Sequence, residues 1–352
     1  MNAALPLHLD YPYADPPAPG ATLEVAPGVV WLRMPLPFAL DHINLWLLAD
    51  GDGWTLVDCG YASDETRALW ERHFATTLAR RPLRRVVATH YHPDHVGNAQ
   101  WLCARAGCAL TMTQAEFMTA HAAADERSGY DVGRIVELFR AHGMTPEHAA
   151  ALQARGNAYR RGVPTLPDSF QRLMKGDGIL VDGKPWHVLE GHGHSPEHAS
   201  LYGTESGALI SGDMLLPRIS TNVSVWAIEP EGDPLQRFLE SLAAFEGLPA
   251  DTLVLPSHGL PFRGIALRVA ELRAHHAARL GELEQAIRQR GPRSAADVLP
   301  VLFRRELDLQ QRFFAMGEAI AHLNHLWHAG RLTRIVTGDN RILFAPPSNH
   351  VT

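Results

Sequence analysis

Long apolar runs and abundant cysteine are both missing from this chain. No apolar run reaches the roughly 18 residues that a membrane-spanning helix needs, so we expect no membrane segment. The first residues, Met1 to Pro6, lack a basic region followed by an apolar segment, so we expect no signal peptide. The three cysteines are an odd number without the spacing of a metal site, which is typical of reduced thiols in a cytoplasmic protein.

What the chain does contain is the composition of an ordinary globular protein. Of its 352 residues, 46% are hydrophobic and 20% are charged. That length suits one large domain, or one domain with a small appendage. Strands are expected at 29–34, 43–48 and 54–57, and a helix at 64–80. This alternation favours two sheets sandwiched between helical layers.

The most informative segment is residues 90–95, with the letters HYHPDH. It follows an apolar, strand-like run and is too short to form a helix face. Imidazole and carboxylate side chains are ligands for borderline and hard divalent cations. The two histidines that lie two positions apart would share one side of an extended segment, and the bend at Pro93 would turn the remaining ligands away. One short loop could therefore serve two metal ions.

Three later segments repeat the order of strand, loop and candidate ligand. They are GHGHSPEH at 191–198, an apolar strand that ends in Asp213, and another that ends in His258. With these segments the chain resembles the metallo-β-lactamase-fold hydrolase superfamily over about residues 28–262. The ordered signature of that family is H-x-H-x-D-H, then His, then Asp, then His. The resemblance implies an α+β fold of the αββα sandwich type.

Carried over residue by residue, the resemblance implies two divalent metal ions. One ion would be held by His90, His92 and His194, the other by Asp94, His95 and His258, with Asp213 bridging the two. This donor set favours zinc and leaves iron and manganese open. A shared carboxylate offsets the repulsion between two dications, and water between them becomes more acidic. A bridging hydroxide is therefore the expected nucleophile.

Asp58 and His198 are expected beside these ligands. Asp58 ends an apolar strand where family members carry an Asp that braces a ligand loop, so we expect it to orient a ligand imidazole. The alternative for Asp58 is a cap on the next helix. We expect catalytic roles for both Asp58 and Asp94. The family pattern selects His194 over its neighbours His192 and His198, which leaves His198 as a buried hydrogen-bonding partner.

The connection from His95 to His194 is unusually long, and its excess lies at about residues 115–175. Their apolar spacing predicts a helical insert. Such an insert would wall the substrate pocket, as loops on a common fold often do, or would simply pack onto the body.

The segment after residue 262 has a different character. A long amphipathic helix is expected at 265–290, further helices are expected at 294–302 and 310–329, and a hairpin follows at 332–344. Helices followed by a hairpin resemble the winged-helix module that some members of this superfamily carry at the same end. We therefore expect a catalytic domain at 1–262 and a winged-helix-like module at 263–352.

The charge of this last segment raises the question of nucleic acid. Residues 261–352 contain 13 Arg, 8 Asp and Glu, and no Lys, whereas residues 1–260 contain 19 Lys and Arg against 30 Asp and Glu. An acidic body and a tail without lysine are poor at following a phosphate backbone. We therefore disfavour a nucleic-acid partner and expect the tail to dock on the body or on a second subunit, which leaves a homodimer open.

Three functions remain open at this point. The leading one is hydrolysis of a small ester-like bond, a thioester or a lactone, in a small-molecule acyl substrate. The second is metal-dependent phosphodiester cleavage of RNA, and the third is a metal-binding or redox module without hydrolysis. The acidic body favours the first over a polyanion. No substrate contact is assigned, because Arg160, Arg161 and Arg218 could bind an anionic group or be solvated surface charges.

Overall fold

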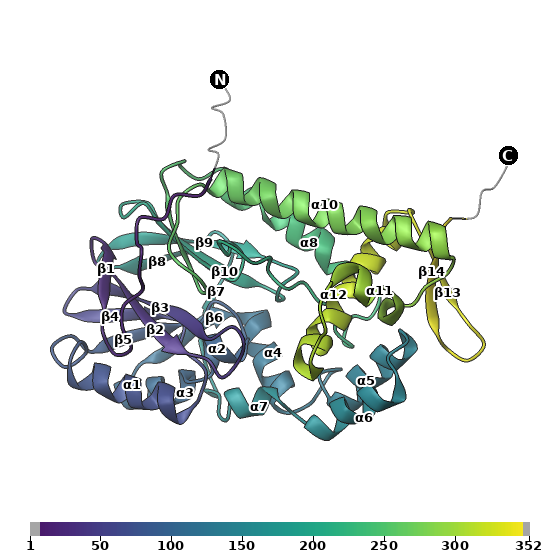
Figure 1. Cartoon of the computed structure of the whole chain (residues 1–352). Helices are drawn as coiled ribbons and strands as arrows, with labels where there is room; N and C mark the ends of the chain where they lie inside the picture. The colour runs from purple at the N-terminus through teal and green to yellow at the C-terminus, as the bar shows by residue number, and fades with distance from the viewer. Residues whose placement is uncertain (1–7, 348–352) are drawn as a thin grey trace. The chain divides into compact units, whose positions relative to one another are not determined.

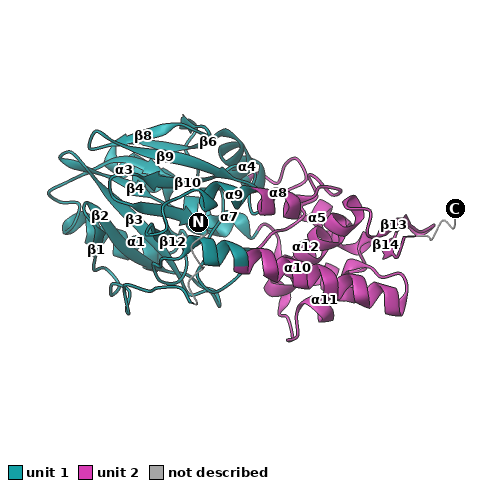
Figure 2. Ribbon diagram, turned by 90° about the horizontal axis from the view of Figure 1, so that it is seen from above, with its two compact units in different colours: residues 1–124, 158–221, 241–270 teal, residues 125–157, 222–240, 271–352 magenta. Residues whose placement is uncertain are grey.

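The computed structural model describes residues 8–347, so the segment on which the expected absence of a signal peptide rests lies outside the described residues. The chain divides into two compact units (Figure 2). Unit 1 consists of Met1–Ala124, Ala158–Thr221 and Ser241–Ala270, and unit 2 of Asp125–Asn157, Asn222–Glu240 and Glu271–Thr352. The expected insert at 115–175 is thus shared between the units. The domain boundary expected at residue 262 stays a prediction.

The first sheet of unit 1 has seven strands among the described residues, in the order β1-β2-β3-β4-β5-β6-β7. Strands β1 to β4 pair antiparallel, and β4 to β7 pair parallel. The bounds are β1 Leu23–Ala26, β2 Val29–Pro35, β3 His42–Asp50, β4 Gly53–Val57, β5 Leu83–Val87, β6 Ala109–Thr113 and β7 Gln171–Leu173. Strand β3 is apolar along nearly its whole length, because both of its faces are buried.

The second sheet of unit 1 has the order β12-β11-β10-β9-β8. Its strands are β8 Gly178–Val181, β9 Lys184–Gly191, β10 His198–Gly203, β11 Ala208–Gly212 and β12 Leu253–Pro256. Only β11 and β12 pair parallel in this sheet, as far as the structure describes it. The two sheets pack face to face through a core that includes Trp31, Trp46, Leu201 and Ile210.

Helices complete the layers of unit 1. Their bounds are α1 Asp64–Ala75, α2 Pro93–Val96, α3 Ala99–Ala106, α4 Gln114–Ala124, α7 Tyr159–Gly162, α9 Ala243–Glu246 and the start of α10, Ile265–Arg290. Helices α1 and α3 lie on the outer face of the first sheet (Figure 1), where Trp70 and Leu102 join its core. The expected α+β class and αββα sandwich are confirmed.

Helix α1 is shorter than expected. The sequence predicted a helix over residues 64–80, but the helix ends at Ala75. Thr76 leaves the helical conformation, and its hydroxyl donates to the carbonyl of Arg72 at 2.8 Å. A β-branched residue with a competing local hydrogen bond explains the early end.

Unit 2 is mainly helical. It contains α5 Val132–Ala141, α6 Pro146–Arg155, most of α8 Pro234–Ser241, most of α10, α11 Ala295–Leu302, α12 Leu309–His328 and a hairpin of β13 Thr333–Val336 and β14 Ile342–Ala345. Capping boxes begin α11 at Ser294 and α12 at Asp308. The expected tail helices and hairpin are confirmed, while their identification as a winged helix stays a prediction. Within residues 8–347, none of the helices combines the length and apolar character that crossing a bilayer requires.

Candidate metal centre

The candidate ligands of unit 1 lie at the ends of strands. Residues 90–95 follow β5, His194 lies in the loop between β9 and β10, Asp213 follows β11 and His258 follows β12. Strands β4 and β5 are parallel neighbours, and so are β11 and β12. Because the carboxyl ends of parallel strands meet at one edge, Asp213 and His258 come together at the edge of the second sheet, and Asp58 after β4 lies beside the loop after β5.

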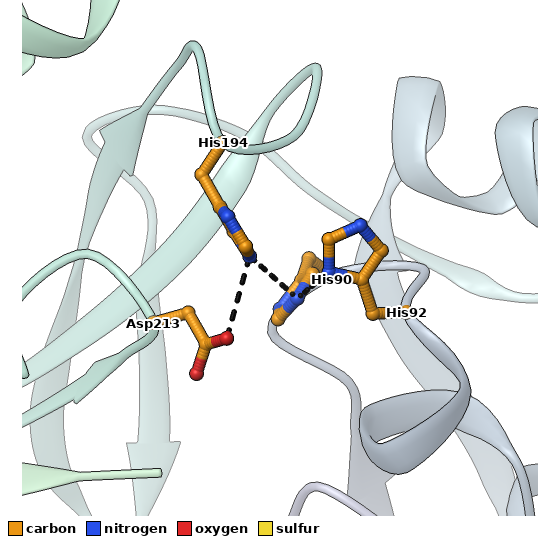
Figure 3. Close-up of side chains that lie close together, drawn as sticks. All are labelled: His90, His92, His194 and Asp213. Atoms are coloured by element: carbon orange, nitrogen blue, oxygen red, sulfur yellow. Dashed lines mark hydrogen bonds and ion pairs between the residues drawn. The ribbon is translucent and has the colours of Figure 1, made fainter. Parts of the chain in front are cut away.

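One group of candidate ligands consists of His90, His92, His194 and Asp213 (Figure 3). The Nε2 atom of His90 lies 2.9 Å from Nδ1 of His92 and 3.2 Å from Nε2 of His194. The Oδ2 atom of Asp213 lies 3.4 Å from His194 Nε2. Three ring nitrogens and one carboxylate oxygen therefore converge on one point.

The second group consists of Asp94, His95 and His258. The Oδ2 atom of Asp94 lies 3.6 Å from His95 Nε2 and 3.4 Å from His258 Nε2. The other oxygen of Asp213, Oδ1, lies 3.6 Å from His95 Nε2 and 3.4 Å from His258 Nε2. The single carboxylate of Asp213 thus faces both groups, one oxygen to each.

Hydrogen bonds on the far side of the rings orient two of these imidazoles. His95 Nδ1 lies 2.8 Å from Asp58 Oδ2, and His258 Nδ1 lies 2.7 Å from the carbonyl of His42. Both partners are acceptors, so Nδ1 of each ring donates to its partner and Nε2 of each ring is the nitrogen turned toward the second group. Asp58 is itself held by Thr89, whose backbone N–H and hydroxyl donate to it at 2.8 and 3.0 Å.

Burial and neighbouring charges set the protonation of the site. Burial lowers the pKa of His92 to about 3 and that of His90 well below its usual range, so both rings are neutral. Burial also acts to lower the pKa of His95, but the charges of Asp58, Asp94 and Asp213 outweigh it and raise the pKa to about 9. The second group therefore attracts positive charge, and the first offers neutral nitrogen ligands.

The residues fit a pair of divalent cations. Among the residues that the structure describes, His95 Nε2 and Asp213 Oδ1 are buried without a hydrogen-bond partner. Such atoms are costly to bury unless something binds them. In the first group, Nε2 of His90 lies 2.9 Å from a nitrogen of His92 and 3.2 Å from a nitrogen of His194, and this one nitrogen of a neutral ring can pair well with only one of them. A metal ion would satisfy all of these atoms, with imidazole and carboxylate as its ordinary ligands.

The other histidines and the arginines that the sequence offered as candidates lie outside both groups. His198 is buried, and its Nε2 accepts from the backbone N–H of Asp213 at 3.1 Å. His192 is partly exposed, with Nδ1 2.7 Å from the carbonyl of Pro196. Arg160, Arg161 and Arg218 are exposed.

Two residues that hold the ligand loops were missed. Glu116 at the start of α4 is fully buried, and it accepts hydrogen bonds from the loops of residues 90–95 and 194–198. Burial raises the pKa of Glu116 to about 7, against the lowering effect of these donors. The strand order could have indicated Glu116. Strand β6 is the parallel neighbour of β5, so the residues after both strands lie at the same edge of the sheet.

Asn44 is the second missed residue. Its amide donates to the carbonyls of Pro256 and Gly259 at 2.8 and 2.9 Å, on either side of His258. The signal in the sequence was a single polar residue in the apolar run of strand β3.

Comparisons with known proteins agree with this arrangement. Residues 39–258 match the family described as metallo-beta-lactamase superfamily, and residues 280–347 match the family described as metallo-beta-lactamase-like, C-terminal domain. The chain is 27% identical over 309 residues to "Probable metallo-hydrolase YqjP" of Bacillus subtilis, covering 85% of this chain and 92% of that protein.

Two solved structures resemble nearly the whole chain. A beta-lactamase domain protein from Burkholderia ambifaria is 49% identical with a TM-score of 0.89, covering 96% of this chain and 98% of the other. A metallo-beta-lactamase family protein from Thermus thermophilus is 30% identical with a TM-score of 0.76, covering 92% of this chain and all of the other. Since the family model alone matches more than half of its length, the chain belongs to the metallo-beta-lactamase superfamily.

Proposed function

We propose that this metallo-hydrolase uses two divalent metal ions to cleave a small ester-like bond, that of a thioester or a lactone. Zinc is the metal that we propose first. The observation that carries the proposal is the carboxylate of Asp213, whose two oxygens face two different groups of ligands. When bound, two such ions supply Lewis acidity that polarises a carbonyl group and lowers the pKa of water.

The residues of the chain would hold and orient this centre. His90, His92 and His194 would hold one ion, Asp94, His95 and His258 the other, and Asp213 would contact both. Asp58 would keep the proton of His95 on Nδ1, away from the metal. Asp94 adds negative charge beside His95 and His258, which offsets the charge of the second ion.

Charge supports a small substrate. Residues 1–260, which contain all the candidate ligands, hold 19 basic and 30 acidic side chains. A net negative body repels a polyanion and tolerates a neutral or weakly charged acyl compound. The name of the Bacillus subtilis relative, a probable metallo-hydrolase, is consistent with hydrolysis and does not identify the bond.

Phosphodiester cleavage of RNA is the second candidate. The observation in its favour is the excess of arginine over acidic residues in 261–352. A nuclease that uses this segment should bind RNA more weakly as the salt concentration rises, and a small-molecule esterase should show no such binding.

The test is a substrate screen with metal-loaded and metal-free protein. Thioesters, lactones, phosphodiesters, single-stranded RNA and cephalosporins would be compared, with the metal content measured on the same samples. We expect hydrolysis of a thioester or lactone that disappears when the metal is removed and returns when it is restored. Robust cleavage of RNA with no turnover of any carbonyl ester would overturn the proposal in favour of the nuclease.

A further inference from the structure

The carboxylate of Glu116 connects two loops that are far apart in the sequence. Its Oε2 atom accepts from the backbone N–H of Tyr91 at 2.9 Å. Its Oε1 atom accepts from the hydroxyl of Ser195 and from the backbone N–H of Glu197, both at 2.7 Å. The side chain is fully buried, so these three donors take the place of water around both oxygens.

The donors sit beside the ligands of one group only. Tyr91 lies between His90 and His92 in the chain, and Ser195 directly follows His194. These three histidines form the first candidate group together with Asp213. One oxygen of Glu116 thus holds the loop of the first two imidazoles, and the other holds the loop of the third.

The junction is held from the other side as well. The carboxylate of Glu197 accepts from the backbone N–H of Ala115 at 3.1 Å, and the hydroxyl of Thr113 donates to the carbonyl of Glu197 at 2.9 Å. The end of β6 and the start of α4 therefore form a fixed support against which the loop at 194–198 is placed. A helix cap does not explain Glu116, because its donors all lie outside α4.

We propose that Glu116 is a positioning residue that sets the distance between the loops of residues 90–95 and 194–198, and thereby the metal affinity of the His90, His92 and His194 group. This inference rests on the proposed metal-dependent function. It goes further by assigning unequal effects to the two groups. In the group of Asp94, His95 and His258, Glu116 contacts only the loop that carries Asp94 and His95. The metal affinity of this group should therefore depend less on Glu116.

Glu116→Gln tests the proposal with little change in volume. An amide has a single acceptor oxygen, so its NH2 must face either Tyr91 N–H or the donors at Ser195 and Glu197. One loop therefore loses its acceptor. We expect the first group to bind metal about 10- to 100-fold more weakly, as is usual when a support of a metal ligand is removed.

The measurement uses single-site backgrounds, so that each group is examined by itself. His258→Ala leaves the first group, and His194→Ala leaves the second. Zinc affinity is measured by competition with a chelator, and the absorption spectrum of the cobalt-loaded protein reports the geometry of the ligands. E116Q should weaken binding and alter the spectrum in the His258→Ala background, and should change affinity less than about threefold in the His194→Ala background.

Glu197→Gln is the matched comparison. Its carboxylate accepts a single hydrogen bond from α4, and an amide oxygen can replace that acceptor. E197Q should therefore cause a smaller loss than E116Q in the same background. Glu116→Asp keeps both oxygens and should recover part of the affinity. If E116Q does not fold, Ser195→Ala removes one donor only, and a loss confined to the first group is again expected.

The outcomes separate this inference from the proposed function. If E116Q loses metal affinity equally at both groups, or at neither, while the wild-type protein binds two ions, the role of Glu116 is overturned. Either result would leave the proposed function standing. A wild-type protein that binds no divalent metal would overturn the proposed function and the inference with it.

Discussion

The imidazole of His198 occupies the space in which a side chain at Gly212 would stand. A Cβ atom built on Gly212 would lie 2.3 Å from Nε2 of His198, and the backbone of Gly212 has a positive φ of 53°. The same Nε2 accepts from the N–H of Asp213, the next residue in the chain. Glycine at 212 therefore leaves room for His198 to hold the backbone of Asp213, whose carboxylate faces both groups of candidate ligands.

Gly212→Ala should destabilise the protein by about 1–3 kcal/mol, because the added methyl group overlaps a buried ring. Asp213 should shift with it, so metal content should fall as well. Gly207→Ala is the matched control, since Gly207 also has a positive φ, 61°, but has open space around it. Urea unfolding and metal analysis of both variants check the prediction. Equal losses for the two variants would contradict a steric cause.

Asp58→Asn should weaken the binding of a metal ion to the group of Asp94, His95 and His258 about 10- to 100-fold. If the amide NH2 faces His95 Nδ1, the ring must move its proton to Nε2, which then cannot bind a metal. Chelator competition measures the affinity. Asp64→Asn, an exposed acid in the first turn of α1, is the control and should bind like the wild type. Unchanged affinity in D58N would show that Asp58 does not orient the ligand.

Asp213→Ala should lose one of the two metal ions and most of the activity. Without the shared carboxylate, two dications would lie close together with less negative charge between them. We expect turnover to fall by at least about 100-fold, and metal analysis to give about one equivalent. A variant that retains both ions and wild-type turnover would show that Asp213 is not the bridge.

The histidine pair of unit 2 should make stability depend on pH. His276 Nδ1 lies 3.1 Å from His322 Nε2, and both rings are buried. Burial lowers the pKa of His276 to about 3 and that of His322 to about 4, with the neighbouring histidines and Arg279 acting in the same direction. The unfolded value is about 6.5, so the unfolded chain takes up protons first as the pH falls. The contribution of the pair to stability is therefore complete above about pH 6.5. It is lost as the pH falls from about 6.5 to about 4 for His322 and to about 3 for His276.

Urea unfolding at pH 7.5 and pH 5 measures this effect. The loss for each imidazole by pH 5 should be on the order of 1–2 kcal/mol. The double variant H276Q/H322Q should lose correspondingly less between the two pH values, whatever its stability at pH 7.5. The difference between the two proteins cancels the contributions of other buried histidines. An equal loss in both would show that the pair does not titrate in this range.

Local patterns were sufficient for much of this protein. The order of the candidate ligands is readable because each follows an apolar strand at short spacing. The helix over residues 265–290 is predicted with the bounds that the structure has, since its apolar residues recur at helical spacing and a glycine flanks each end. The end of α1 is not predicted from the sequence. The helix ends where Thr76 donates a hydrogen bond to the carbonyl of Arg72, and apolar periodicity does not show this contact.

The sequence by itself determined the chemical types, the order and the strand-end positions of the candidate ligands, because these depend on neighbours only a few residues away. Tertiary structure decided that one oxygen of Asp213 faces His194 and the other His258, and that Glu116 holds two loops about a hundred residues apart. It also placed residues 125–157 in the same unit as most of the tail. Such relationships arise when strands that are distant in the sequence pair side by side. The spacing of residues along the chain does not show which of these strands will pair.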